Sequence, residues 1–161
     1  MKPYKNFTLE QYLDAVAAKS AVPGGGSVAA LTAALGTALI AMVANYSLGR
    51  GSPRKVEGRL KKILATSEKL RRRLLQLVDS DARAYLQVVA TRQAAPAKKK
   101  TALRQARQVP GEVCRCCYAA IQLTTFLVTN GNKYLMSDVE VAGELLLSAF
   151  KSAAVNIAVN Q

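Results

Sequence analysis

Hydrophobic residues recur every three or four positions along most of the chain, a period that predicts helices. The longest pattern runs from Val56 to Val88 and indicates one long helix with an apolar stripe. Its members are Val56, Leu60, Ile63, Ser67, Leu70, Leu74, Leu77, Asp81, Tyr85 and Val88. No segment alternates with a period of two for long. The pattern therefore predicts an all-α protein: a single bundle of five or six helices with one long central helix.

Shorter sequence motifs indicate where the other helices begin and end. Thr8 and Gln11 have the spacing of a capping box, and the apolar face that follows predicts a helix ending near Lys19. Pro110 with Gly111 is expected to break or kink a later helix, because proline lacks the backbone N–H group. Residues 129–138 are expected to form a loop. Ser137 and Glu140 have the spacing of a second capping box.

The segment from Ala21 to Ser47 contains no charged residue and begins with "AVPGGGS". Ser27 is the expected N-cap of a helix that continues to Ser47. This helix is long enough to span a membrane. It consists mainly of small residues, however, and a helix that is apolar on all sides also suits the centre of a soluble bundle. We favour the buried helix over the membrane span.

The glycine run is not a P-loop, since no Lys-Ser/Thr pair follows it and no strand precedes it. A glycine-rich helix start leaves backbone amides open to an anion or a carbonyl oxygen. Alternatively, the glycine run is only a tight turn between two helices and binds no ligand.

The net charge of +13 is concentrated in residues 51–110, which hold sixteen basic and four acidic side chains. Such a patch is either a solvated helix face or a surface for nucleic acid, anionic lipid or a polyanionic small molecule.

Three cysteines, Cys114, Cys116 and Cys117, crowd one turn, and the chain has no histidine. A zinc site is not expected from this set. Buried thiols in a reducing compartment are expected instead. The N-terminus "MKPYKNFTLE" shows no signal peptide, so a cytoplasmic location is predicted.

Asp81 is the most informative residue of the long stripe. Burying a carboxylate on such a stripe costs several kcal/mol of folding free energy unless the carboxylate is paired with another group or has a role in catalysis. The alternative is a kink or helix end near Asp79–Asp81, with Asp81 as an N-cap.

Four segments, in order, resemble the cyclodeaminase/cyclohydrolase family. They are "TLEQYLDAVAAKSAVPGGGSVAALTAALGTALIAMVANYS", "DSDARAYLQVV", "VPGEV" and "GNKYLMSDVEVAGELLLSAFKSAAVNIAVN". The resemblance covers nearly the whole chain.

The resemblance implies an all-α homodimer that acts on one-carbon tetrahydrofolates without a metal or redox cofactor. One branch of the family cyclises 5-formimino-tetrahydrofolate to the 5,10-methenyl compound and releases ammonia. The other hydrolyses the methenyl compound to 10-formyl-tetrahydrofolate. Family members usually continue beyond "VNIAVN" into another long helix. The single domain 1–161 is accordingly expected to be a shortened chain or a reduced form of the bundle.

Asp81 and Asp138 match the two acidic positions of the family. With no histidine in the chain, carboxylates or lysine must transfer protons. Asp81, in an apolar bundle, is assigned the proton transfer. Asp138, at a helix start, is assigned to the N–H groups of the pterin. The expected substrate-binding residues are Gly24, Gly25, Gly26, Ser27, Asn132, Lys133, Ser137, Asn156 and Asn160.

The basic residues 51–110 would attract the glutamate tail of a folate, whether one glutamate or several. One rival hypothesis is a basic helical protein of the same fold that binds nucleic acid or another polyanion and has no activity. A membrane protein built around residues 27–47 is a third, less favoured hypothesis.

Overall fold

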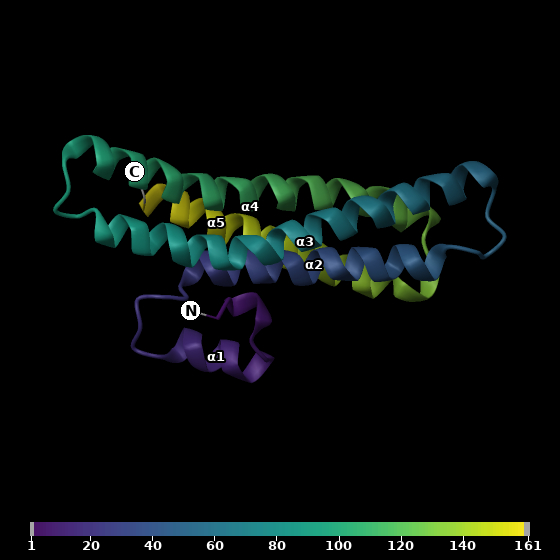
Figure 1. Ribbon diagram of the computed structural model, residues 1–161. Helices are drawn as coiled ribbons and strands as arrows, with labels where there is room; N and C mark the ends of the chain where they lie inside the picture. The colour runs from purple at the N-terminus through teal and green to yellow at the C-terminus, as the bar shows by residue number, and fades with distance from the viewer. Residues whose placement is uncertain (1, 160–161) are drawn as a thin grey trace.

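The computed structural model describes residues 2–159, and these form helices and connections without a strand (Figure 1). Five α-helices and two short 3-10 helices (η) follow one another as η1 Tyr4–Asn6, α1 Leu9–Ala17, α2 Gly25–Ser47, α3 Arg54–Ala90, α4 Pro96–Asn130, η2 Lys133–Leu135 and α5 Met136–Val159. The predicted all-α bundle is confirmed.

Helices α2 to α5 lie side by side, and α1 stands apart next to α2 (Figure 1). The start of α2, the α3–α4 connection and the end of α5 share one end of the bundle, and the α2–α3 and α4–α5 connections share the other.

Small residues allow α2 to approach its neighbours closely. A Cβ atom added at Gly36 would lie 3.0 Å from Leu146 and 3.1 Å from the Ala142 carbonyl oxygen, both on α5. Helix α2 and the segment Lys133–Val159 are long and apolar enough to cross a membrane, and a buried core helix passes the same test. In α2, 61% of the most apolar 18-residue window is buried. Its small residues therefore serve helix packing, as the sequence predicts.

Helix α3 is continuous over 37 residues, so the predicted single long helix is confirmed. It neither ends nor begins near Asp81. Asp81 is thus not the N-cap of its own helix. Its neighbour Asp79 is buried and accepts a hydrogen bond of 2.6 Å from the Tyr4 backbone N–H, which fastens η1 to the bundle.

Of the break or kink predicted at Pro110, the break is wrong, because α4 runs through Pro110 and Gly111 without interruption, and the kink stays a prediction. Pro110 cannot donate the usual backbone hydrogen bond. Buried residues on both sides, Ala106 and Val113, hold the two halves of α4 in the bundle. Their packing outweighs the lost hydrogen bond.

The predicted loop 129–138 is also too long. Helix α4 extends to Asn130, and residues from Lys133 onward are again helical. The second capping box is wrong, because α5 begins at Met136 and Ser137 lies inside it. Asn132 is the capping residue here, since its side chain accepts a 3.1 Å hydrogen bond from the Tyr134 N–H. At the other end of the chain, the Thr8–Gln11 capping box is confirmed.

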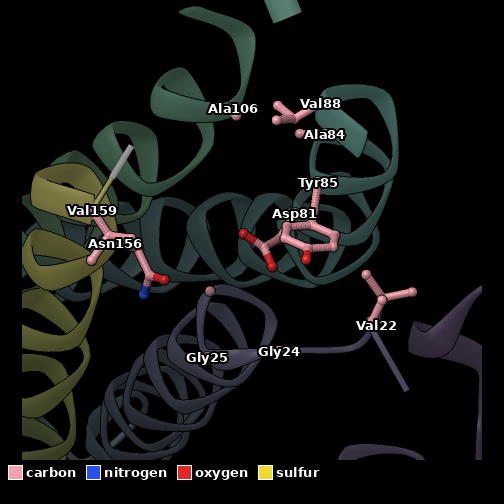
Figure 2. A pocket seen from close by; sticks show the side chains of 12 residues that line it. Val22, Gly24, Gly25, Asp81, Ala84, Tyr85, Val88, Ala106, Asn156 and Val159 are labelled. Carbon is pink, nitrogen blue, oxygen red and sulfur yellow. The ribbon is translucent and has the colours of Figure 1, made fainter. Parts of the chain in front are cut away.

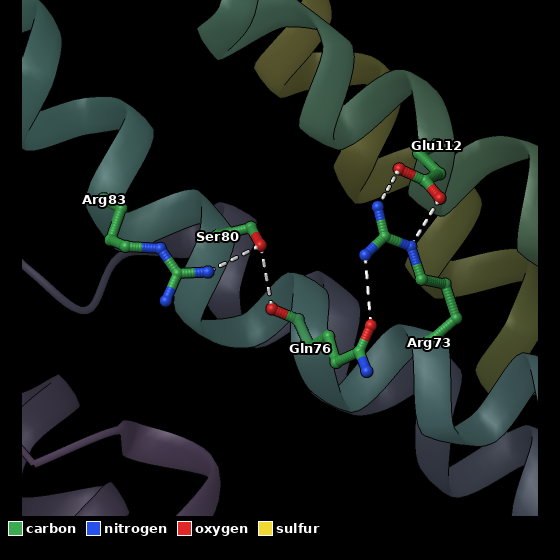
Figure 3. Close-up of polar contacts among 5 residues, drawn as sticks. All are labelled: Arg73, Gln76, Ser80, Arg83 and Glu112. Carbon is green, nitrogen blue, oxygen red and sulfur yellow. Dashed lines mark hydrogen bonds and ion pairs between the residues drawn. The ribbon is translucent and has the colours of Figure 1, made fainter.

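A bidentate ion pair joins the outer faces of α3 and α4 (Figure 3). Arg73 donates from Nε to Glu112 Oε1 at 2.6 Å and from Nη2 to Oε2 at 2.7 Å. The hydrogen bond from Arg73 lowers the pKa of Glu112, and partial burial opposes this shift.

Replacing Glu112 with Gln is expected to lower the free energy of unfolding at pH 7 by less than about 1 kcal/mol, because the pair is partly exposed to solvent. The lowered pKa of Glu112 means that its stabilisation is present above the unfolded-state pKa and is lost as the pH falls through the folded-state value. Urea unfolding at pH 7 and at acid pH measures both effects. An equal loss of stability at both pH values would contradict the assignment.

Candidate active site

A cavity of about 260 Å³ lies at the N-terminal end of α2, between α3, α4 and α5 (Figure 2). The connection before α2 and the first residues of α2 form one wall, and one face of α3 forms another. The lining residues are Ala21, Val22, Gly24, Gly25, Gly26, Asp81, Ala84, Tyr85, Val88, Ala106, Asn156 and Val159. The predicted residues Asp81, Asn156 and the three glycines thus meet at one site, although they come from three helices.

The carboxyl group of Asp81 lies directly against Gly26. A Cβ atom at Gly26 would overlap the Asp81 carboxyl group, whose farthest atom, Oδ2, would be 2.8 Å away. The backbone N–H of Ser27 favours the ionised form of this carboxyl group. The Asp81 carboxyl group therefore lies over the first turn of α2, and only glycine leaves room for it.

Burial raises the pKa of Asp81, and the hydrogen bond from the Ser27 N–H partly opposes this rise. Asp81 is the one ionisable carboxyl among the cavity-lining residues. A carboxyl group with a raised pKa exchanges a proton more readily near neutral pH. The cavity thus holds a proton donor or acceptor beside the open amides of a helix start.

Two further polar side chains lie near Asp81 (Figure 2). Asn156 Nδ2 donates a 2.9 Å hydrogen bond to the Ser152 carbonyl oxygen, which orients the amide group of Asn156 next to Gly25. Tyr85 lies one helical turn after Asp81 on α3. The sequence places Tyr85 on the same stripe, but it was not predicted as a site residue; its spacing of four from Asp81 was the available signal.

The side chain of Ser27 does not face the cavity. It is fully buried, and its Oγ shares a 2.8 Å hydrogen bond with the Tyr12 hydroxyl. The predicted N-cap role of Ser27 is wrong, because α2 begins earlier and Gly24 is its N-cap. Helix α2 begins with two glycines, and the second of them leaves room for the Asp81 carboxyl group.

The other predicted site residues, Asn132, Lys133, Ser137 and Asp138, lie at the opposite end of the bundle. The backbone N–H of Asn132 donates a 2.8 Å hydrogen bond to Ser47 Oγ at the C-terminal end of α2. The 23 residues of α2 separate this end from Gly25 by about 33 Å at 1.5 Å per residue. One chain therefore does not bring Asp138 and Asp81 together. Asn160, also predicted, lies outside the described residues.

A second cavity of about 420 Å³ lies at that opposite end. Its lining residues are Ser47, Arg50, Ser52, Asn130, Gly131, Asn132, Lys133 and Tyr134. Lys133 and Tyr134 are both exposed, and Tyr134 keeps 87% of its accessible surface. This cavity carries cationic side chains, whereas the Asp81 cavity carries an acidic one.

The cysteines lie in neither cavity. Cys116 and Cys117 are buried and Cys114 is partly buried, and all three are free thiols. Burial raises the pKa of Cys117 to about 12, so this thiol is unreactive. Within residues 2–159, no three His, Cys, Asp or Glu side chains lie together as potential metal ligands.

Residues 8–161 match the family model described as formiminotransferase-cyclodeaminase. The chain belongs to this family. It is 36% identical over 165 residues to methenyltetrahydrofolate cyclohydrolase of Methylorubrum extorquens, covering 96% of this chain and 79% of the relative. It is 31% identical to formimidoyltransferase-cyclodeaminase of Mus musculus, covering 95% of this chain but 30% of the mouse protein.

The fold agrees with a solved member of the family. The crystal structure of formiminotetrahydrofolate cyclodeaminase from Thermotoga maritima superposes with a TM-score of 0.93 at 29% sequence identity, covering 97% of this chain and 79% of that one. The predicted family and the interpretation as a folate enzyme are thereby confirmed.

Proposed function

We propose that the Asp81 cavity performs acid–base catalysis at the carbon between N5 and N10 of a one-carbon tetrahydrofolate. The observation that supports this most directly is the position of Asp81: a partly buried carboxyl group with a raised pKa, held against Gly26 at the start of α2. The helix-start amides are suited to an oxygen atom of the substrate.

Hydrolysis of the methenyl compound is the first candidate reaction, because the cyclohydrolase of Methylorubrum extorquens is similar over most of both chains. The Asp81 carboxylate takes a proton from water as its oxygen bonds to the methenyl carbon. The same proton then passes to N5 as the bond from carbon to N5 breaks. The remaining hydroxyl proton is released to solvent, and 10-formyl-tetrahydrofolate remains.

Cyclodeamination is the second candidate, favoured by the similarity to the Thermotoga maritima cyclodeaminase. Here N10 attacks the carbon of the protonated formimino group, and Asp81 takes the N10 proton and returns it to the departing nitrogen. Ammonia leaves, and the methenyl compound forms. Both reactions use one carboxyl group that first accepts and then donates a proton.

The proposal also covers the oligomeric state of the protein and its cellular compartment. The outer side of α2 is apolar and exposed, which supports a homodimer, and three free thiols support a reducing cytoplasm. The basic residues of α3 and α4 would attract the glutamate tail of the substrate, whether one residue or several. A lower KM for a polyglutamylated than for a monoglutamylated folate, with a difference that shrinks in salt, would support the last point.

Ultraviolet absorbance of the methenyl compound distinguishes the two reactions. Incubation with methenyl-tetrahydrofolate should reduce the absorbance if the chain is a cyclohydrolase. Incubation with formimino-tetrahydrofolate should increase it and release ammonia if the chain is a cyclodeaminase. If neither substrate is converted above the rate without protein, the proposed function is wrong.

The hydrolysis rate is expected to fall on the acid side at a pH above 3.8, the ordinary value for an aspartate, because burial raises the pKa of Asp81. The base form is the ionised one, so activity is present above the folded-state pKa and is lost as the pH falls through it. The measurement is kcat/KM against pH after subtraction of the uncatalysed rate. A profile that stays flat down to pH 4 would argue against Asp81 as the base.

A further inference from the structure

The outer surface of α3 carries a dense group of cations in its first two thirds. Residues 54–76 contain nine basic and two acidic side chains, and eight of the nine basic side chains are exposed. The exposed ones are Arg54, Lys55, Arg59, Lys61, Lys62, Lys69, Arg72 and Arg73. This segment therefore holds much of the positive charge of the chain on one solvent-facing surface.

Most of these cations have no acidic partner. Glu68 pairs with Arg71 at 2.7 Å and with Arg72 at 3.8 Å. Arg73 pairs with Glu112 on α4 (Figure 3). Within residues 2–159, no carboxylate lies at ion-pair distance from the remaining six, which are Arg54, Lys55, Arg59, Lys61, Lys62 and Lys69. Like charges this close repel one another, so a polyanion that binds here relieves a repulsion present in the free protein.

Two depressions lie along this surface, where α3 runs beside α4 (Figure 1). The first has a volume of about 560 Å³ and is lined by Arg54, Lys55, Val56, Gly58, Arg59, Lys62 and Phe126. The second has a volume of about 680 Å³ and is lined by Ala65, Glu68, Lys69, Arg72, Arg73, Gln76 and Glu112. Each depression takes most of its lining from α3 and one residue from α4.

The two depressions follow one line along α3. Their lining residues include a series at steps of three or four, which share one face of a helix: Arg54, Gly58, Lys62, Ala65, Lys69, Arg72 and Gln76. The 22 steps from Arg54 to Gln76 correspond to about 33 Å. We name the two depressions together the basic groove.

The basic groove also has an apolar part. Val56 and Phe126 line the first depression beside its four cations, and both are partly buried. Between Arg54 and Arg73, the exposed residues other than the cations are Gly58, Ala65 and Thr66. No large apolar side chain thus projects from this part of α3, as insertion into a membrane surface would require. Cations beside a recessed aromatic ring suit a strand of phosphates and bases.

The basic groove is separate from the Asp81 cavity. Lys62, near the middle of the groove, precedes Asp81 by 19 residues on the same helix, which corresponds to about 29 Å. The groove and the cavity share no lining residue. A ligand in the groove therefore does not occupy the site of the proposed reaction.

We propose that the basic groove binds single-stranded nucleic acid, as a function additional to the reaction at Asp81. The cations contact backbone phosphates, and a base stacks on the Phe126 ring. At a stacked spacing of roughly 3.4 Å per nucleotide, the groove holds about ten nucleotides. Its contacts go to phosphates and to the face of a base, so binding does not depend on a particular sequence. A duplex fits less well, because its paired bases are not available to Phe126.

Fluorescence anisotropy tests the class of ligand. Labelled oligouridine and oligothymidine of about 12 nucleotides are expected to bind with a Kd below about 10⁻⁴ M at physiological salt. The plot of log K against log salt concentration is expected to have a slope of about −4, the value for six phosphate contacts on a single strand. Tighter binding of oligouridine assigns the groove to RNA. Equal or tighter binding of oligothymidine assigns it to single-stranded DNA.

Four results would overturn the proposal. They are no saturation with either strand, tighter binding of a duplex than of the single strands of the same length, equally tight binding of a glutamate peptide of the same length, and binding to phosphatidylserine vesicles without binding to either strand. The last two would assign the cations to carboxylates or to a membrane surface.

Charge-matched variants locate the site. Lys62→Gln combined with Lys69→Gln is expected to weaken binding and to make the salt slope shallower by about 1.4, since two phosphate contacts are lost. Lys99→Gln combined with Lys100→Gln removes the same charge from exposed positions of α4 outside the groove. This second pair is expected to leave the slope unchanged. Equal effects of the two pairs would mean that net charge alone attracts the strand, and the groove would be excluded as the site.

Phe126→Leu tests the stacking contact. Leucine keeps an apolar side chain but has no aromatic face. Affinity for both strands is expected to fall about fivefold or more with an unchanged salt slope, because stacking on an aromatic ring contributes at least this much per base. Wild-type affinity in a variant with the wild-type melting temperature would overturn the single-strand assignment. Failure of the wild type to convert either folate would refute the proposed function and would leave these binding results as they are.

Discussion

The Asp81→Asn variant is expected to lose roughly 10²–10⁴-fold in turnover, the usual contribution of a general acid or base. Asparagine keeps the size of the side chain and can still accept the hydrogen bond from the Ser27 N–H. It cannot take or return a proton. The loss should therefore fall on kcat, with little change in KM, measured with methenyl- and formimino-tetrahydrofolate. Wild-type turnover in this variant would remove Asp81 from the mechanism.

The same variant is expected to be at least as stable as the wild type. Because burial raises the pKa of Asp81, its stabilising effect is present below the unfolded-state pKa and is lost as the pH rises through the folded-state value. The melting temperature of Asp81→Asn relative to the wild type should therefore increase from pH 4 to pH 8. A relative loss of stability towards pH 8 would indicate that Asp81 serves mainly as an ionised cap for α2.

Asp79→Asn is the matched control. Asp79 lies two residues away on the same helix, is buried and accepts a hydrogen bond from the Tyr4 N–H. It is absent from the lining of the Asp81 cavity. Its replacement should lower the melting temperature and change turnover little. A large loss of turnover in Asp79→Asn would show that the α3 surface as a whole, and not Asp81 alone, determines the rate.

The helices could be predicted from the sequence because an apolar stripe depends only on the spacing of hydrophobic residues that are close together in the chain. The stripe from Val56 to Val88 marks α3 correctly, and the capping box at Thr8 marks the start of α1. A break at Pro110 was wrongly expected because the cost of proline is local, whereas the packing of Ala106 and Val113 that compensates for it comes from other helices. The loop predicted around Asn132 was too long for a local reason. The Asn132 side chain alone caps the short helix that follows, and so ends the loop early.

The site could be predicted in part. Asp81 was conspicuous as a carboxylate on an apolar stripe, and the glycine run as an unusual helix start. Their contact was not predictable from local pattern, since Asp81 lies against the start of a helix that begins 56 positions earlier in the chain. The role of Ser27 was misassigned for the same reason. Helix α2 begins before Ser27, and the Ser27 hydroxyl is hydrogen-bonded to Tyr12.

Replacing Gly26 with Ala is the second change with a large expected effect. The new Cβ atom would overlap the Asp81 carboxyl group, so either α2 shifts or the Asp81 side chain turns away from the Ser27 N–H. Overpacking of this kind costs about 1–3 kcal/mol of unfolding free energy. Turnover should fall as well, since both responses move the carboxyl group from its position.

Two further variants identify the cause. Gly25→Ala places its Cβ 3.9 Å from Asn156, which is ordinary contact, and should cost little stability. In the Asp81→Ala background the obstacle is gone, and Gly26→Ala should become neutral or stabilise the protein by up to about 1 kcal/mol, because alanine favours helix over glycine. This change of sign in a double-mutant cycle, measured by urea unfolding, is specific to the contact between Gly26 and Asp81. An equal cost of Gly26→Ala in both backgrounds would mean that glycine is needed at position 26 for another reason, and that the carboxyl group of Asp81 is not held against the start of α2.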